Sequence, residues 1–172
     1  KLMKSKKNLV FLGMMGSGKS SIGYLVSKRL KLNFIDIDHE IENELGTTIK
    51  KIFTTRGENY FRTVEEKITL KKLQLRNAII SLGGGAFVNK KIQKEVLKNH
   101  ISFWLKVNDE TIIKRVKNSE KRPIALKATN HELIELIKKR SYIYSRALYK
   151  IKCDNITKKK IVDKILNIYE TN

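Results

Sequence analysis

The sequence has one cysteine, one proline and no long apolar run. A single cysteine, Cys153, cannot form an internal disulfide or build a cysteine-rich metal site, which fits a reducing compartment. No segment approaches the roughly 18 apolar residues that a membrane-spanning helix needs. The opening residues, KLMKSKKNLV, contain neither a long apolar segment nor a small-residue cleavage site of the kind found in signal peptides. We therefore expect a cytoplasmic protein with no membrane partner.

Acidic residues are also scarce. The chain has 17 Asp and Glu residues but 37 Lys and Arg residues, which gives a formal net charge of +20 at pH 7. Such a charge is typical either of binding to nucleic acid or membranes or of a lysine-rich proteome. The basic residues are mostly lysines scattered along the chain, and no basic block interleaved with aromatic residues accompanies them. We expect no specific nucleic-acid partner, and anionic small substrates account for part of the charge.

The 172 residues are 41% hydrophobic, which suits one domain with a sizeable core. Apolar, β-branched or aromatic runs alternate with helical spacing, which predicts βαβ units and a parallel sheet covered on both faces. The predicted strands cover residues 8–12, 33–37, 78–82 and 101–107 and the region around Ile151. The clearest predicted helices cover residues 20–30 and 109–117 and a closing segment that contains Ile161 and Leu166.

The stretch GMMGSGKS after the first predicted strand fits the pattern G-x-x-x-x-G-K-[ST]. Glycines let backbone N–H groups approach phosphate oxygens, and the helix that follows adds its positive N-terminal end. The lysine supplies a cation to the outer phosphates, and the hydroxyl of Ser20 can ligate Mg²⁺. This pattern predicts a nucleoside triphosphate site made by Gly13, Gly16, Ser17, Gly18, Lys19, Ser20 and Ser21.

Three further clusters follow predicted strands. FIDIDHEIE places Asp36 and Asp38 on the same side of an extended segment, although acidic residues at a helix start would give the same pattern. GENYFRTVEE offers Arg62 with Glu65 one helical turn later, a spacing that by itself is typical of a surface ion pair. SLGGGAF carries three successive glycines, whose entropic cost favours a ligand approaching closely over an ordinary turn.

Taken together, the chain resembles the shikimate kinase family along nearly its whole length. The matching segments occur in order: GMMGSGKSSIG, FIDIDHEIE, GENYFRTVEE, SLGGGA, KRPIAL and KKRSYIYSRA. The resemblance implies a three-layer α/β/α P-loop fold, similar to nucleoside monophosphate kinases, with a five-stranded parallel sheet. It also implies transfer of the ATP γ-phosphate to the 3-hydroxyl of shikimate, a step toward chorismate and the aromatic amino acids.

The resemblance further assigns roles to individual residues. A shikimate-binding set is implied at Asp38, Arg62, Gly83, Gly84, Gly85 and Arg140. Asp36 resembles the carboxylate that orients the water shell of Mg²⁺, Arg122 the arginine that reaches the phosphates, and Arg115 the arginine that packs on adenine. Lys19, Asp38 and Arg122 are the expected catalytic residues. Asp38 could accept the proton of the attacking hydroxyl or only orient that hydroxyl.

We expect one kinase domain over residues 1–172, active as a monomer, with a substrate-binding region at about 37–66. Residues 117–130, which contain Pro123, are expected to form a lid. The chain departs from the usual family pattern in two places: the lid reads RPIAL, which includes Ala125, and Tyr142 replaces a proline. Two alternatives remain at this point, namely a gluconate kinase-like enzyme and a basic P-loop protein that binds nucleic acid.

Overall fold

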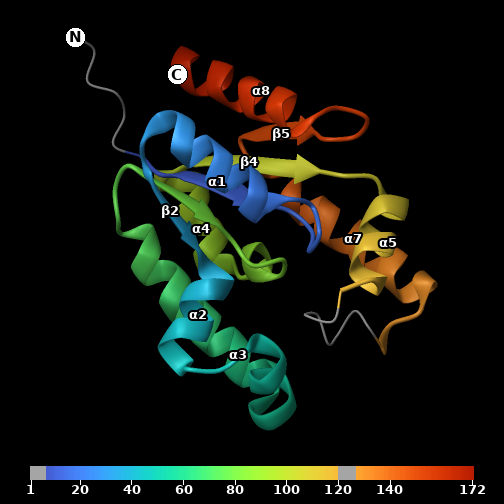
Figure 1. The fold of residues 1–172 in the computed structure, drawn as a ribbon. Coiled ribbons are helices and arrows are strands. Elements are labelled where there is room, and N and C mark those ends of the chain that lie inside the picture. Colours follow the sequence, from blue (N-terminus) through green and yellow to red (C-terminus); the bar gives the residue numbers. More distant parts are fainter. Residues whose placement is uncertain (1–6, 120–126) are drawn as a thin grey trace.

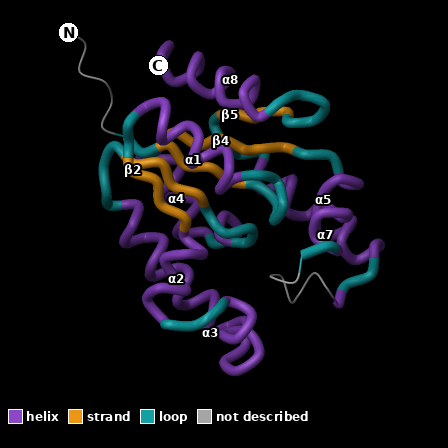
Figure 2. The backbone as a smooth tube through the Cα atoms, viewed as in Figure 1, coloured by secondary structure: helices purple, strands orange, loops and turns teal. Residues whose placement is uncertain are grey.

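The computed structural model describes residues 7–119 and 127–172. Its centre is a five-stranded parallel sheet in the order β2-β3-β1-β4-β5 (Figures 1 and 2). The strands are β1 (Leu9–Leu12), β2 (Asn33–Asp36), β3 (Ala78–Ser81), β4 (Ile101–Lys106) and β5 (Tyr149–Lys152). The predicted α/β class with a five-stranded parallel sheet is confirmed.

The central strand β1 shows why the sheet is covered on both faces. Its four residues are fully or almost fully buried, and consecutive side chains contribute to different hydrophobic clusters. Leu9 and Phe11 pack with residues of α1 and α8, whereas Val10 and Leu12 pack with residues of α2, α3, α4 and α7. Because side chains alternate across a strand, a continuous apolar run fits only a strand between two helical layers.

Seven α-helices connect or cover the strands in the described residues. They are α1 (Lys19–Leu30), α2 (Ile37–Leu45), α3 (Ile49–Leu73), α4 (Lys90–Asn99), α5 (Asp109–Lys117), α7 (Asn130–Tyr144) and α8 (Lys158–Thr171). Helix α3 is kinked at Gly57, and a 3₁₀ turn covers Ala86–Val88. Side chains of Asp, Thr or Asn cap the first turns of six of these helices, which fixes where each helix begins.

One boundary differs from the sequence prediction in a way that matters for the site. The second strand ends at Asp36, and Ile37 already begins α2, so Asp36 and Asp38 do not share one side of an extended segment. The cause is the Asp36 carboxylate, which accepts a hydrogen bond from the backbone N–H of His39 and caps the helix. The prediction of an extended segment through Asp38 was therefore wrong.

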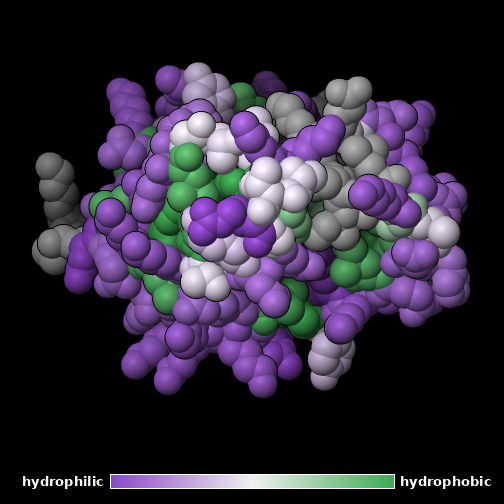
Figure 3. Space-filling model, turned by 90° about the horizontal axis from the view of Figure 1, so that it is seen from below, coloured by the Kyte–Doolittle hydropathy of each residue, from purple (hydrophilic) through white to green (hydrophobic). Residues whose placement is uncertain are grey.

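Among the helices of residues 7–119 and 127–172, none is both long and apolar enough to cross a bilayer. Seen from below, the surface is mostly hydrophilic, and hydrophobic residues show only in a few patches (Figure 3). Because all five strands are parallel, their carboxyl ends lie at one edge of the sheet, where α1, α2 and the glycine-rich turn after β3 begin. Ligands of open α/β sheets bind at this edge.

Candidate active site

The loop between β1 and α1 has the geometry of a phosphate-binding loop. Gly16 and Gly18 adopt positive φ angles of 77° and 93°, which favour glycine. Lys19 is only 7% exposed, and its ammonium group donates hydrogen bonds to the carbonyls of Gly13 (2.9 Å) and Met14 (2.8 Å). Two backbone carbonyls of the loop therefore hold the lysine that the motif predicts.

The N-terminus of α1 is suited to an anion. Its capping residue, Gly18, has no side chain to satisfy the first N–H groups, and no acidic residue lies in the first turn. Unsatisfied N–H groups and the positive end of the helix dipole favour phosphate at such a position. The hydroxyl of Ser17 is buried in the loop and has no hydrogen-bond partner among the described residues. The structure thus leaves polar groups available where the motif predicts phosphate.

Two side chains with oxygen atoms that could ligate a metal ion, Ser20 and Asp36, meet beside the loop. The hydroxyl of Ser20 donates a hydrogen bond to the carboxylate of Asp36, which joins the start of α1 to the end of β2. Mg²⁺ prefers oxygen ligands, keeps several of its waters and is commonly shared with nucleotide phosphates. The chemistry of this Ser20–Asp36 pair therefore fits the predicted magnesium site.

Two basic side chains from distant segments also contact the loop region. Arg115 of α5 donates a hydrogen bond to the carbonyl of Gly16 (2.8 Å), which places this predicted adenine contact beside the loop. Lys158, the first residue of α8, donates to the hydroxyl of Ser21 (2.9 Å). Sequence analysis missed Lys158, because its tract of lysines gives no sign that one of them reaches back to α1.

The turn after β3 needs three glycines because different groups crowd each one. A Cβ on Gly83 would lie 2.8 Å from both the carboxylate of Asp38 and that of Glu65. A Cβ on Gly84 would lie 3.1 Å from the backbone nitrogen of Met15 in the phosphate loop, and one on Gly85 would lie 2.7 Å from the guanidinium of Arg62. The turn therefore lies tightly against Asp38, Glu65 and Arg62 and against the phosphate loop at Met15.

Arg62 and Glu65 form the predicted pair, but it is not a surface ion pair. Arg62 Nη1 donates to Glu65 Oε1 at 2.8 Å, and the Glu65 side chain is only 3% exposed. Burial raises the pKa of Glu65, and the charge of Asp38 acts in the same direction, while Arg62 and Arg140 oppose the shift. Sequence spacing could identify the pair, but only the fold reveals that Glu65 is buried.

Arg140 of α7 lies close enough to Glu65 for its charge to lower the pKa of that carboxyl, although the two residues are 75 positions apart in the sequence. It is 8% exposed, and its Nη1 atom is buried with no hydrogen-bond partner in the described part of the chain. A buried guanidinium nitrogen without a partner is costly, and a bound anion would satisfy it. The structure thus brings both predicted substrate arginines to one cluster with Asp38 and Glu65.

A tyrosine that sequence analysis did not single out completes this cluster. Tyr144 is 1% exposed, and its hydroxyl donates to the carbonyl of Gly84 and contacts the sulfur of Met14 at 3.8 Å. Burial raises the pKa of this phenol to about 12. The only available signal was its position four residues after Arg140, which places both side chains on one face of a helix.

Other predicted features lie partly or wholly elsewhere. Arg122, Pro123 and Ala125 lie outside the described residues, as does most of the predicted lid at 117–130. Tyr142, the residue found in place of a proline, is 73% exposed on α7, and the guanidinium of Arg146 lies over its ring, 5.9 Å from the ring centroid. That departure from the family pattern therefore lies on the exposed side of the helix and not among the buried site residues.

The strand order, the phosphate loop and the adjoining cluster of buried arginine and carboxylate groups define a P-loop phosphotransferase. The family model for shikimate kinase matches residues 15–170. The chain therefore belongs to the shikimate kinase family, which confirms the resemblance, and it is an ATP-dependent kinase.

Individual relatives agree. The chain is 38% identical to a shikimate kinase of Persephonella marina over 160 residues, which cover 93% of this chain and 97% of the relative. It is 36% identical to that of Caldicellulosiruptor bescii, with 95% of each chain covered. A solved shikimate kinase of Acinetobacter baumannii in complex with shikimate superimposes with a TM-score of 0.92 at 28% identity, covering 98% of this chain and 96% of that one. These findings favour shikimate kinase over the gluconate kinase-like alternative.

Proposed function

We propose that this kinase binds shikimate between α3, α7 and the turn after β3, and binds ATP on the loop between β1 and α1. The γ-phosphate then passes directly to the 3-hydroxyl of shikimate. Arg62 and Arg140 clamp the substrate carboxylate, Gly83–Gly85 let the ring approach the backbone, and Asp38 contacts the reacting hydroxyl. Lys19 stabilises the charge of the transferred group.

The observation that carries this proposal is the state of Arg140. Its guanidinium is buried and lacks a partner at Nη1, while Arg62 is already bonded to Glu65 nearby. A guanidinium fork matches a carboxylate through two parallel hydrogen bonds, and such charge-assisted bonds are about twice as strong as neutral ones. A small carboxylic acid therefore supplies what Arg140 lacks, whereas an uncharged polyol does not.

Asp38 has a different part in the same cluster. Its carboxylate lies with that of Glu65 against Gly83, beside the turn that we propose the substrate contacts. The transition state of phosphoryl transfer is loose, and its main demand is alignment of the hydroxyl rather than early removal of its proton. We assign Asp38 chiefly to orienting the hydroxyl, with acceptance of its proton late in the reaction.

Magnesium is proposed to lie beside Ser20 and Asp36. The Ser20 hydroxyl would ligate the ion, and the Asp36 carboxylate would hold its waters. Bound there, Mg²⁺ would neutralise charge on the nucleotide phosphates. Asp36 is already fixed in place because it also caps α2, so the oxygen pair is preorganised by the fold.

The remaining assignments are proposals of the same kind. Arg115 would pack on adenine, since it already lies against Gly16 at the loop. Arg122 and residues 117–130 would close over the phosphates and exclude water, which protects ATP from hydrolysis. The enzyme is proposed to form one domain and to act as a cytoplasmic monomer, without a nucleic-acid partner.

A coupled assay of ADP release tests the proposed function. Shikimate, gluconate and nucleoside monophosphates are supplied separately with ATP and Mg²⁺. We expect rapid, shikimate-dependent ADP release with stoichiometric formation of shikimate 3-phosphate, and only background rates with the other acceptors. A rate with gluconate or a nucleoside monophosphate equal to that with shikimate would contradict the proposed substrate.

A further inference from the structure

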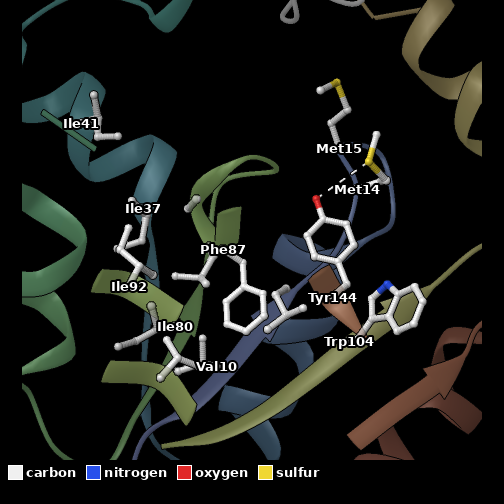
Figure 4. Packing of buried hydrophobic residues seen from close by; sticks show 14 of the residues in the cluster. Val10, Met14, Met15, Ile37, Ile41, Ile80, Phe87, Ile92, Trp104 and Tyr144 are labelled. Carbon is white, nitrogen blue, oxygen red and sulfur yellow. Dashed lines mark hydrogen bonds between the residues drawn. The ribbon is translucent and has the colours of Figure 1, made fainter. Parts of the chain in front are cut away.

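The phenol of Tyr144 lies between the two loops that hold the proposed substrates. Tyr144 is the last residue of α7, and its hydroxyl donates to the carbonyl of Gly84 in the turn after β3. The same hydroxyl contacts the sulfur of Met14 in the phosphate loop at 3.8 Å, as the dashed line in Figure 4 shows. One polar atom thus touches the loop after β1 and the turn after β3.

These two loops must keep a fixed separation for transfer to occur. Reacting atoms have to approach to about 3–3.5 Å in line, and an error of about 1 Å can cost about a hundredfold in rate. The loops already touch, because the space beside Gly84 is closed by the backbone of Met15. The Tyr144 hydroxyl adds a bond to the Gly84 carbonyl at this contact, so it helps to hold the two loops in their relative position.

The position of Tyr144 along its helix adds a third connection. Arg140 precedes it by four residues, so both side chains project from one face of α7. Arg140 opposes the rise in the pKa of Tyr144 through its charge and through a side-chain hydrogen bond, so the two groups lie close together. The same helix face therefore presents a substrate clamp and the contact between the loops.

We propose that Tyr144 is a positioning residue that sets the distance between the phosphate donor and the acceptor hydroxyl. It acts through Gly84 and Met14 and does not touch the reacting atoms. This inference rests on the proposed function, because it assumes that ATP occupies the phosphate loop and shikimate the glycine turn.

The hydroxyl can be separated from the ring. The ring is packed in the core against Trp104, with ring centroids 6.0 Å apart, and phenylalanine would preserve that packing (Figure 4). With a pKa of about 12, the phenol stays protonated and remains a donor throughout the working pH range of an enzyme. Removing only the oxygen therefore tests the positioning role and leaves the hydrophobic contacts in place.

The test compares Tyr144→Phe with wild type by kcat, directly titrated Kd for ATP and for shikimate, and shikimate-binding stoichiometry. We expect kcat per binding site to fall about tenfold to a hundredfold, while both Kd values stay within about threefold. Tyr149→Phe is the matched control, because its hydroxyl bonds to Asn172 instead of the loops. We expect that control to keep wild-type kcat.

A fall in kcat smaller than about fivefold, or a Kd that changes as much as kcat does, would overturn the proposal. If Tyr144→Phe does not fold, Met14→Leu carries the test: it removes the sulfur contact, and an unchanged kcat overturns the proposal. Failure of the proposed function would look different. In that case wild type itself would show no shikimate-dependent ADP release.

Discussion

The guanidinium of Arg62 donates a 2.8 Å hydrogen bond to the carboxylate of Glu65, a side chain that is only 3% exposed. The buried carboxylate holds the partly exposed arginine in place before any substrate arrives. Glu65 also lies against Gly83, as Asp38 does, so it links the arginine to the glycine turn. An arginine held in this way loses little conformational freedom when it binds a carboxylate, which favours affinity.

Truncation of either clamp arginine should weaken shikimate binding selectively. Loss of one partner from a buried charge pair costs about 2–5 kcal/mol, so Arg62→Ala and Arg140→Ala should each raise shikimate Kd at least about 30-fold. ATP Kd should change by less than about threefold. Separate titrations of ATP and shikimate measure these two Kd values.

Arg56→Ala is the control for these titrations, because Arg56 is exposed on the same helix as Arg62 and lies over the ring of Tyr60 at 4.0 Å. Equal weakening of ATP and shikimate binding by Arg62→Ala would contradict the assignment.

Substitution of Gly85 by alanine should reproduce the loss of Arg62. The new Cβ would collide with the guanidinium at 2.7 Å, and the backbone of Gly85 (φ −100°, ψ −3°) accepts alanine without strain. The arginine is flexible enough to move aside, so the protein should fold while shikimate binding falls about tenfold or more. In a double-mutant cycle, Gly85→Ala and Arg62→Ala should be far from additive, because both remove one interaction. Additive effects would show that the two residues act separately.

The pH dependence of stability should identify Glu65 as a buried acid. Its pKa is raised in the folded state, first by burial. The native state therefore binds a proton more tightly than the unfolded state, and stability is lost as pH rises from below the ordinary glutamate range through the raised pKa. Relative to Glu65→Gln, wild type should become steadily less stable over that interval.

Chemical denaturation at several pH values measures this difference, and Glu66 provides a control of opposite sign. Hydrogen bonds from Asn89 and Lys91 lower the pKa of Glu66, so its contribution to stability is lost as pH falls. Wild type should therefore gain stability with rising pH relative to Glu66→Gln. Parallel pH profiles for wild type and Glu65→Gln would contradict the burial of an ionisable Glu65.

Replacement of Lys19 by alanine should abolish turnover and leave the fold intact. Phosphoryl transfer depends on positioning and on stabilising charge, so loss of this cation should lower kcat at least about a hundredfold. The thermal midpoint and kcat are measured together. Lys28→Ala is the control, since Lys28 is an exposed residue of the same helix. A Lys19→Ala enzyme with kcat near the wild-type value would remove the loop from the nucleotide site.

Asp38→Asn should separate alignment from proton transfer. An amide keeps the shape of the carboxylate and part of its hydrogen bonding but cannot take a proton. If Asp38 chiefly orients the hydroxyl, kcat should fall and shikimate Kd should rise by similar factors, about tenfold each. A much larger loss of kcat with unchanged Kd would make Asp38 a general base. Wild-type values for both would remove it from the site.

Sequence alone determined the features that depend on local chemistry. Alternating apolar runs and helical spacing predicted a parallel sheet covered on both faces, because these periodicities reflect how side chains leave a strand or a helix. The sequence also predicted the phosphate-binding loop with Lys19 and Ser20, because all of its ligating groups lie within one short segment. The order of further motifs identified the family.

Tertiary structure decided which groups are buried and which meet. The spacing of Arg62 and Glu65 is typical of a surface ion pair. In the folded chain, α3 packs against the glycine turn, and the Glu65 carboxylate is buried there. Tyr144 gained a role only because the end of α7 lies beside the loops after β1 and β3, and Lys158 because α8 begins next to α1. Desolvation and contact between distant segments arise from the whole packed chain, so no local pattern encodes them.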